Sequence, residues 1–94
     1  MYARIVRFND CDLERISELV ARIEEEGPPP GVDSTRIQMF VDEAKGTAVI
    51  VGYFETEQKM HDANAVFEEM DPSETPGIRA SIDLCELKLE HSSS

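Results

Sequence analysis

Two helical stripes of apolar residues, each set between strand-like segments, constrain the fold of this chain more than any other feature. Apolar residues recur at spacings of three and four, which is typical of one face of a helix. The first stripe comprises Leu13, Ile16, Leu19, Val20 and Ile23, and the second comprises Met60, Ala63, Val66, Phe67 and Met70. Asp10 or Asp12 can cap the first helix and Thr56 the second, because their side-chain oxygens accept hydrogen bonds from free amides. Gly27–Gly31, with three successive prolines, ends the first helix, and Asp71-Pro72 ends the second.

Four other segments are rich in β-branched and aromatic residues, as strands are. They are residues 2–8, residues 35–42, Thr47–Phe54 and a final strand from Ile78 to about Leu87. Glu43–Gly46 between the second and third strands reads as a turn with glycine at a position of positive φ, which predicts a β-hairpin.

The order β-α-β-β-α-β predicts an α+β, ferredoxin-like fold. Short connections and right-handed crossovers place two helices on one face of a four-stranded antiparallel sheet. With 94 residues, the chain is expected to form one domain over 1–94, with its core in 2–88 and a frayed tail at 89–94.

Two helices cover only one face of such a sheet, yet the hairpin is apolar on both. We expect one hairpin face to pack under the helices, namely Ile37, Met39, Val41, Val49, Val51 and Tyr53. The other face would then carry Phe40, Ile50 and Phe54, mixed with Arg36 and Gln38. Leaving these three hydrophobic side chains in water would create an apolar patch on a small monomer. We therefore expect a second sheet to cover them in a two-fold homodimer; the alternative is a monomer that tolerates scattered exposed hydrophobic residues.

Charge excludes several classes of partner. The chain has 20 acidic and 9 basic residues, a formal net charge of −11, which suits neither nucleic acid nor an anionic membrane surface. The amino-terminal segment has two arginines and no long apolar run, so we do not expect a signal peptide, and no segment is long enough for a membrane span. Cys11 and Cys85 lie outside any CxxC motif and are expected to be free thiols in a cytoplasmic protein.

The opening Tyr2-Ala3-Arg4-Ile5-Val6, the hairpin with Asp42 and Gly46, and the junction Gly52-Tyr53-Phe54-Glu55-Thr56-Glu57 carry a resemblance that spans residues 2–88. The chain resembles the dimeric α+β barrel superfamily and, within it, antibiotic-biosynthesis-monooxygenase-like domains. The resemblance implies two sheets packed face to face, with a pocket between each sheet and its own helices.

Members that oxidise polyphenols or cleave haem tend to hold an asparagine near the first strand and a tryptophan on the second helix, and the haem cleavers add a histidine. Asn9 matches the asparagine, whereas the chain has no tryptophan and Ala63 stands near that position. His61 lies too early for the family histidine. These departures from the family pattern argue against haem degradation.

Several polar side chains are pocket candidates, each with a structural alternative. Arg4 and Arg7 lie on opposite faces of the first strand, where one can hold a substrate anion or pair with Asp83. Tyr53 can donate a hydrogen bond to a ligand or simply pack. His61 can shuttle protons or be solvated.

Two functions follow as expectations. One is a cofactor-independent monooxygenase-like enzyme acting on a small aromatic or polyketide-like molecule, with a pocket lined by Ile37, Met39, Val51 and Phe67 and polar contacts from the candidates above. The other is a non-catalytic module for ligand binding or assembly. We expect no metal, because Glu57, His61 and Asn64 at helical spacing lack a third strong ligand, and no other cofactor.

Overall fold

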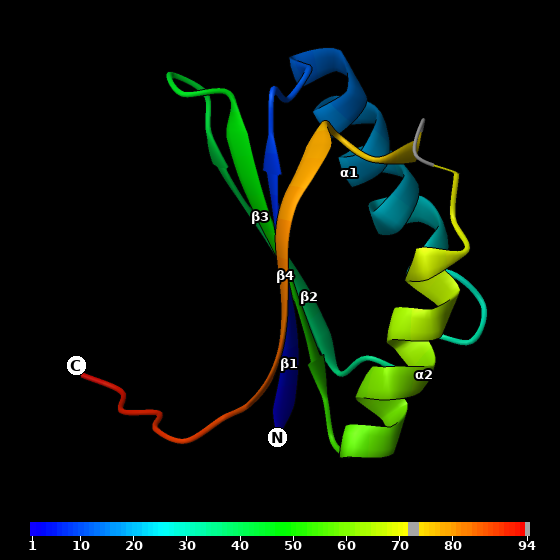
Figure 1. Ribbon diagram of the computed structural model, residues 1–94, viewed down its shortest axis with the longest axis vertical. Coiled ribbons are helices and arrows are strands. Elements are labelled where there is room, and N and C mark those ends of the chain that lie inside the picture. Colours follow the sequence, from blue (N-terminus) through cyan, green and yellow to red (C-terminus); the bar gives the residue numbers. More distant parts are fainter. Residues whose placement is uncertain (72–73, 94) are drawn as a thin grey trace.

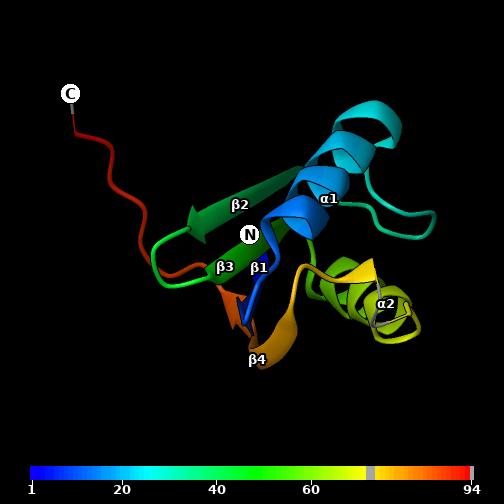
Figure 2. The ribbon, with the colours of Figure 1, turned by 90° about the horizontal axis from the view of Figure 1, so that it is seen from above.

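The computed structural model describes residues 1–71 and 74–93, and its six elements follow the expected order. They are β1 (Tyr2–Asn9), α1 (Leu13–Glu26), β2 (Arg36–Asp42), β3 (Thr47–Phe54), α2 (Glu57–Glu68) and β4 (Ile78–Glu86). The strands form one sheet in the order β2-β3-β1-β4, and each neighbouring pair is antiparallel. Both helices lie on the same side of this sheet (Figures 1 and 2). The fold is thus the ferredoxin-like α+β arrangement.

Short polar residues set the helix starts. The carboxylate of Asp12, not that of Asp10, caps α1 and accepts a hydrogen bond from the amide of Glu14 at 2.8 Å. Thr56 caps α2 through the amide of Lys59 at 3.1 Å. Gly27, with φ of 73°, ends α1 where the prolines begin. The second helix ends at Glu68, before the expected stop at Asp71-Pro72, of which Pro72 lies outside the described residues.

The turn of the hairpin determines which residues share a face. Gly46 has φ of 67°, as expected, and its amide donates to the carbonyl of Asp42 at 2.9 Å. Asp42 therefore pairs with Thr47, and farther along the hairpin Ile37 pairs with Gly52. Because directly opposed residues of antiparallel strands project to the same side, odd positions of β2 share a face with even positions of β3.

The sheet thus has two distinct faces. The cavity face, toward the helices, carries Tyr2, Arg4, Val6, Phe8, Ile37, Met39, Val41, Ala48, Ile50, Gly52 and Phe54. The open face carries Ala3, Ile5, Arg7, Arg36, Gln38, Phe40, Asp42, Thr47, Val49, Val51, Tyr53, Ser81, Asp83 and Cys85. Neither helix covers the open face (Figure 1).

The expected distribution of the hairpin residues was wrong by one register step. Ile50 and Phe54 belong to the cavity face, and Phe54 is only 1% exposed. Val51 and Tyr53 belong to the open face, together with Phe40. Apolar residues mixed with polar ones still occupy the open face after this correction, because Val49, Val51 and Tyr53 replace Ile50 and Phe54 there.

The core lies between the amino-terminal half of α2 and one end of the sheet. Phe54, Met60, Ala63 and Val32 are buried against one another. Tyr2, Val66 and Phe67 pack around this cluster.

The start of α1 is held by backbone hydrogen bonds. The amide of Cys11 donates to the carbonyl of Gly46 at 2.9 Å, and the amide of Asp12 donates to the carbonyl of Pro76 at 3.1 Å. One end of α1 is therefore tied both to the hairpin turn and to the segment before β4. Cys11 and Cys85 are free thiols, as expected.

A candidate ligand cavity between the sheet and the helices

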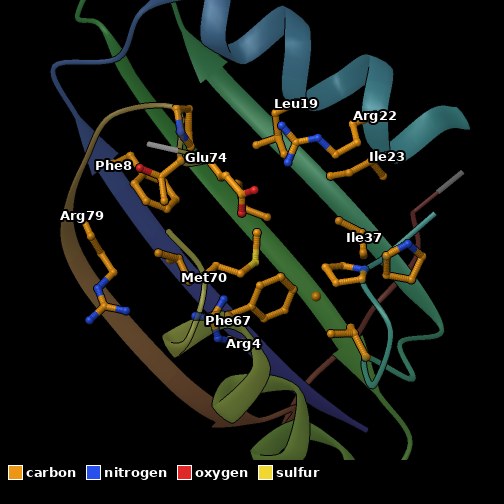
Figure 3. Close-up of a pocket in the computed structure, with 18 of the residues that line it drawn as sticks. Arg4, Phe8, Leu19, Arg22, Ile23, Ile37, Phe67, Met70, Glu74 and Arg79 are labelled. Carbon is orange, nitrogen blue, oxygen red and sulfur yellow. The ribbon is translucent and has the colours of Figure 1, made fainter. Parts of the chain in front are cut away.

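The space between the sheet and the helices holds a cavity of about 1180 Å³ that opens to solvent. Figure 3 shows Leu19 and Ile23 of α1, Ile37 of β2 and Phe67 of α2 around it. The floor is the cavity face, with Val6, Phe8, Ile50 and Phe54. Ligand pockets in proteins usually enclose about 300–1,000 Å³ and are mostly apolar with a few polar groups. This cavity is likewise mostly apolar with a few polar groups, and its volume is somewhat larger than that range.

Arg4 is the buried charge of the cavity. Arg4 is only 8% exposed, and its Nε donates a hydrogen bond to Oδ1 of Asn64 on α2 at 3.0 Å. Its Nη2 lies 4.0 Å from Oε1 of Glu68. Removal from water disfavours the guanidinium cation, and this burial lowers the pKa of Arg4 to about 10, although Glu68 opposes the shift.

Glu68 is held mainly by Arg79 at the start of β4. Both nitrogens of the Arg79 fork donate to the Glu68 carboxylate, one of them to Oε2 at 3.3 Å. This hydrogen bonding is the main cause that lowers the pKa of Glu68 and raises the pKa of Arg79. The pair joins the end of α2 to β4 beside the cavity.

Positive side chains are concentrated in the cavity wall. Four of the six arginines of the chain line it, namely Arg4, Arg15, Arg22 and Arg79. Only four of the 20 acidic residues do so, namely Asp10, Glu26, Glu68 and Glu74. The described lining is therefore balanced in charge, within a chain of net charge −11.

Three of the sequence candidates meet at the cavity: Arg4, Ile37 and Phe67. The described lining does not include Met39, although Met39 lies on the cavity face. Val51 was assigned to the lining and lies on the open face instead, because it pairs with Gln38 and Ile5.

Two further candidates lie on the open face. Arg7 is exposed there, opposite Val49. Tyr53 donates a hydrogen bond from its hydroxyl to Oε1 of Gln38 at 3.0 Å, and Arg36 lies over its ring with 5.9 Å between Cζ and the ring centroid. Neither side chain can contact a ligand in the cavity while the sheet lies between them.

Asn9 and His61 are also outside the described lining. Asn9 is exposed at the end of β1. His61 is half-exposed on α2, with its Nε2 at 3.4 Å from Oε1 of Glu57 one turn earlier. The polar residues expected to meet at one site thus lie in four separate places: the cavity, the open face, the end of β1 and the surface of α2.

Sequence reasoning missed the partners of Arg4. Asp83 was the expected counterion, but it pairs with Ile5 on the open face, and Glu68 lies beside Arg4 instead. Asn64 carried a usable signal, because it continues the stripe from Met60 toward Phe67 at spacings of four and three. A polar residue at such a position indicates a buried hydrogen-bond partner.

Among residues 1–71 and 74–93, no group of three or more His, Cys, Asp or Glu side chains is placed to hold a metal ion. Within the same part of the chain, no helix combines the length and apolar character that crossing a membrane requires. No protein-family model matches the chain, and neither a curated protein nor a solved structure matches it.

Proposed function

We propose that this protein is a small-molecule-binding domain whose ligand occupies the space between the sheet and the helices. The carrying observation is the open cavity of about 1180 Å³ with its apolar lining and one buried cation. Well-packed domains leave few voids larger than a water molecule. A concave apolar site with a few converging polar groups is where small molecules usually bind.

Binding is better supported than oxidation. The expected monooxygenase-like enzyme would take polar contacts from Asn9, Tyr53 and His61, and none of them is in the described lining. General acid–base chemistry needs a group within hydrogen-bond reach of the reacting atom. Arg4 remains, and an arginine side chain binds and orients anions without exchanging protons at neutral pH.

We also propose that two copies associate through the open face, as in the dimeric α+β barrel superfamily. Ile5, Val49, Val51, Tyr53 and Phe40 form an apolar band across that face, and Phe40 is 58% exposed. A second copy is the occupant that charge favours. The open face holds two arginines and two aspartates, Arg7, Arg36, Asp42 and Asp83, so two copies of a chain of net charge −11 meet there without net repulsion.

The binding function is tested with Nile red, an uncharged dye that fluoresces in apolar sites. Because the chain has no tryptophan, Ile23→Trp introduces one large side chain into the cavity wall, and Ser17→Trp on the exposed side of α1 is its matched control. We expect the native protein and Ser17→Trp to bind the dye and Ile23→Trp to bind it weakly. Equal binding by both variants, or none by the native protein, overturns the proposal.

An oxygen electrode separates binding from catalysis. We expect no oxygen uptake above the buffer rate when hydroquinone is added to the native protein. Sustained uptake that needs the folded protein overturns the non-catalytic assignment and supports the monooxygenase-like alternative.

Light scattering tests the association. At micromolar concentration we expect the native protein to have the mass of two chains and the Phe40→Glu variant to have the mass of one chain. Leu13→Glu is the control, because Leu13 is 53% exposed on α1, away from the open face. A native mass of one chain, or a dimer that survives Phe40→Glu, contradicts the proposed interface.

A further inference from the structure

We infer that the ligand of the cavity is an organic carboxylate whose anionic end binds Arg4 and whose apolar body lies between Phe67 and the floor of the sheet. This inference rests on the proposed binding function and specifies the chemical class of ligand. Four observations support it: the unused donors of Arg4, the engagement of Glu68 elsewhere, the charge of the cavity wall and the apolar surroundings.

Arg4 retains donors for a ligand. Its guanidinium has five N–H groups. Within the described part of the chain, its one hydrogen bond runs from Nε to Asn64, which leaves the outer nitrogens without a hydrogen-bonded acceptor. A buried cation is costly unless it is both paired and hydrogen-bonded. The planar fork of an arginine matches the two oxygens of a carboxylate.

Glu68 does not fill this role. Its carboxylate is bonded by both nitrogens of Arg79, and its closest approach to Arg4 is 4.0 Å, beyond hydrogen-bonding distance. Asn64 positions the Arg4 side chain from the other side. The outer nitrogens of Arg4 are therefore available to a second anion.

The cavity wall does not share the strong negative charge of the whole chain. Four of six arginines line the cavity against four of 20 acidic residues. A concave site of low dielectric concentrates the field of its charges. A negatively charged ligand thus meets no net repulsion from the described cavity wall, and the buried Arg4 is the charge that attracts it.

A carboxylate on an apolar body fits these surroundings better than a phosphate. Arg4 is the buried cation and lies over the ring of Phe67. It pairs with Gly52, and Ile50 and Phe54 stand two positions to either side of Gly52 on the same face of the sheet. One cation matches one negative charge, whereas a phosphate dianion would keep an unpaired charge in an apolar site.

A matched pair of probes tests the inference. Naphthalene-2-carboxylate and naphthalene-2-carboxamide share the same ring and differ in charge, and naphthyl phosphate serves as the phosphate arm. By calorimetry at pH 7 we expect the carboxylate to bind the native protein about tenfold more tightly than the amide, since hydrogen bonds to charged groups are stronger than neutral ones. We expect the phosphate to bind less tightly than the carboxylate.

Two arginines of the same strand provide the variants. Arg4→Gln should remove the preference for the carboxylate while the amide binds as before, and Arg7→Gln, on the opposite face, should retain the preference. In the native protein, the Nε–H resonance of Arg4 should shift with the carboxylate and not with the amide, a measurement that does not depend on the folding of a variant.

The outcomes separate the two proposals. If neither naphthalene compound nor Nile red binds, the binding function fails and this inference fails with it. If the amide and the carboxylate bind equally, if the phosphate binds most tightly, or if Arg4→Gln keeps the carboxylate preference, the binding function stands and the carboxylate assignment is wrong.

Discussion

The guanidinium of Arg4 lies over the ring of Phe67, with 4.5 Å between Cζ and the ring centroid. A cation over the face of an aromatic ring is attracted by the electron density of that face. Together with the hydrogen bond to Asn64, this contact determines the orientation of the only buried charged side chain among the described residues. The ring thus orients the guanidinium of Arg4 and occupies none of the N–H donors of its outer nitrogens.

Replacing Arg4 by methionine should separate stability from binding. Burial lowers the pKa of Arg4 to about 10, so at neutral pH the folded protein carries the full cost of holding this cation away from water. We expect Arg4→Met to leave the free energy of unfolding unchanged or to raise it by about 1 kcal/mol, because apolar substitution of buried charges is often neutral or stabilising. Urea unfolding at pH 7 measures this. A clear loss of stability would mean that Arg4 serves mainly as a structural ion pair.

Acid should weaken the contact between α2 and β4. The hydrogen bonds from Arg79 hold the pKa of Glu68 below its ordinary value of 4.5. A lowered carboxyl pKa stabilises the folded state above the ordinary value, and this stabilisation is lost as the pH falls through the lower folded value. Native protein should therefore be more stable than Glu68→Gln at pH 7, and the difference should disappear as the pH falls through the lowered pKa of Glu68. A difference that does not change as the pH is lowered would contradict the pairing.

Substitution of Gly77 should be more harmful than substitution of Gly27. A Cβ at Gly77 would lie 2.4 Å from the carbonyl oxygen of Asn9, and backbone atoms cannot move aside cheaply. At Gly27 a Cβ would meet nothing within 4 Å, so the cost comes from its positive φ alone. We expect Gly77→Ala to lose about 1–3 kcal/mol, the usual cost of overpacking, and Gly27→Ala about 1 kcal/mol. Thermal unfolding of both variants gives the comparison, and the reverse order would show that β1 and β4 are arranged differently.

A pair of phenylalanines tests the hairpin register. Phe54 is 1% exposed on the cavity face and Phe40 is 58% exposed on the open face. Phe54→Ala should cost about 3–5 kcal/mol, as large-to-small core substitutions do. Phe40→Ala should change the unfolding free energy of the single chain by about 0.5 kcal/mol or less. Urea titrations at a dilution where light scattering gives one chain would show this, and equal costs would argue against the assigned faces.

Local chemistry made the element order predictable. Thr56 and Gly46 act through neighbours within a few residues, so their roles as cap and turn former can be read directly from the sequence, which also narrows the cap of α1 to Asp10 or Asp12. The two helical stripes and the Gly27–Gly31 break then leave one plausible topology for the four strands.

The faces of the hairpin were harder to predict. Alternation in β3 is weak, because Ala48, Val49, Ile50 and Val51 are all apolar. The register then depends on the pairing of Asp42 with Thr47 across the turn, and a one-residue difference exchanges the two faces of a strand. The partners of Arg4 are 60 or more positions away, on α2, and no local pattern ties them to β1.

The backbone hydrogen bonds from Cys11 and Asp12 fix only the amino-terminal end of α1. The opposite end leads into Gly27 and the prolines, where Leu19 and Ile23 meet the cavity. A helix secured at one terminus can tilt about that terminus with little loss of backbone bonding. The ligands that we propose can therefore differ in width at the Ile23 end of the cavity, where none of the described backbone hydrogen bonds ties α1 to the sheet.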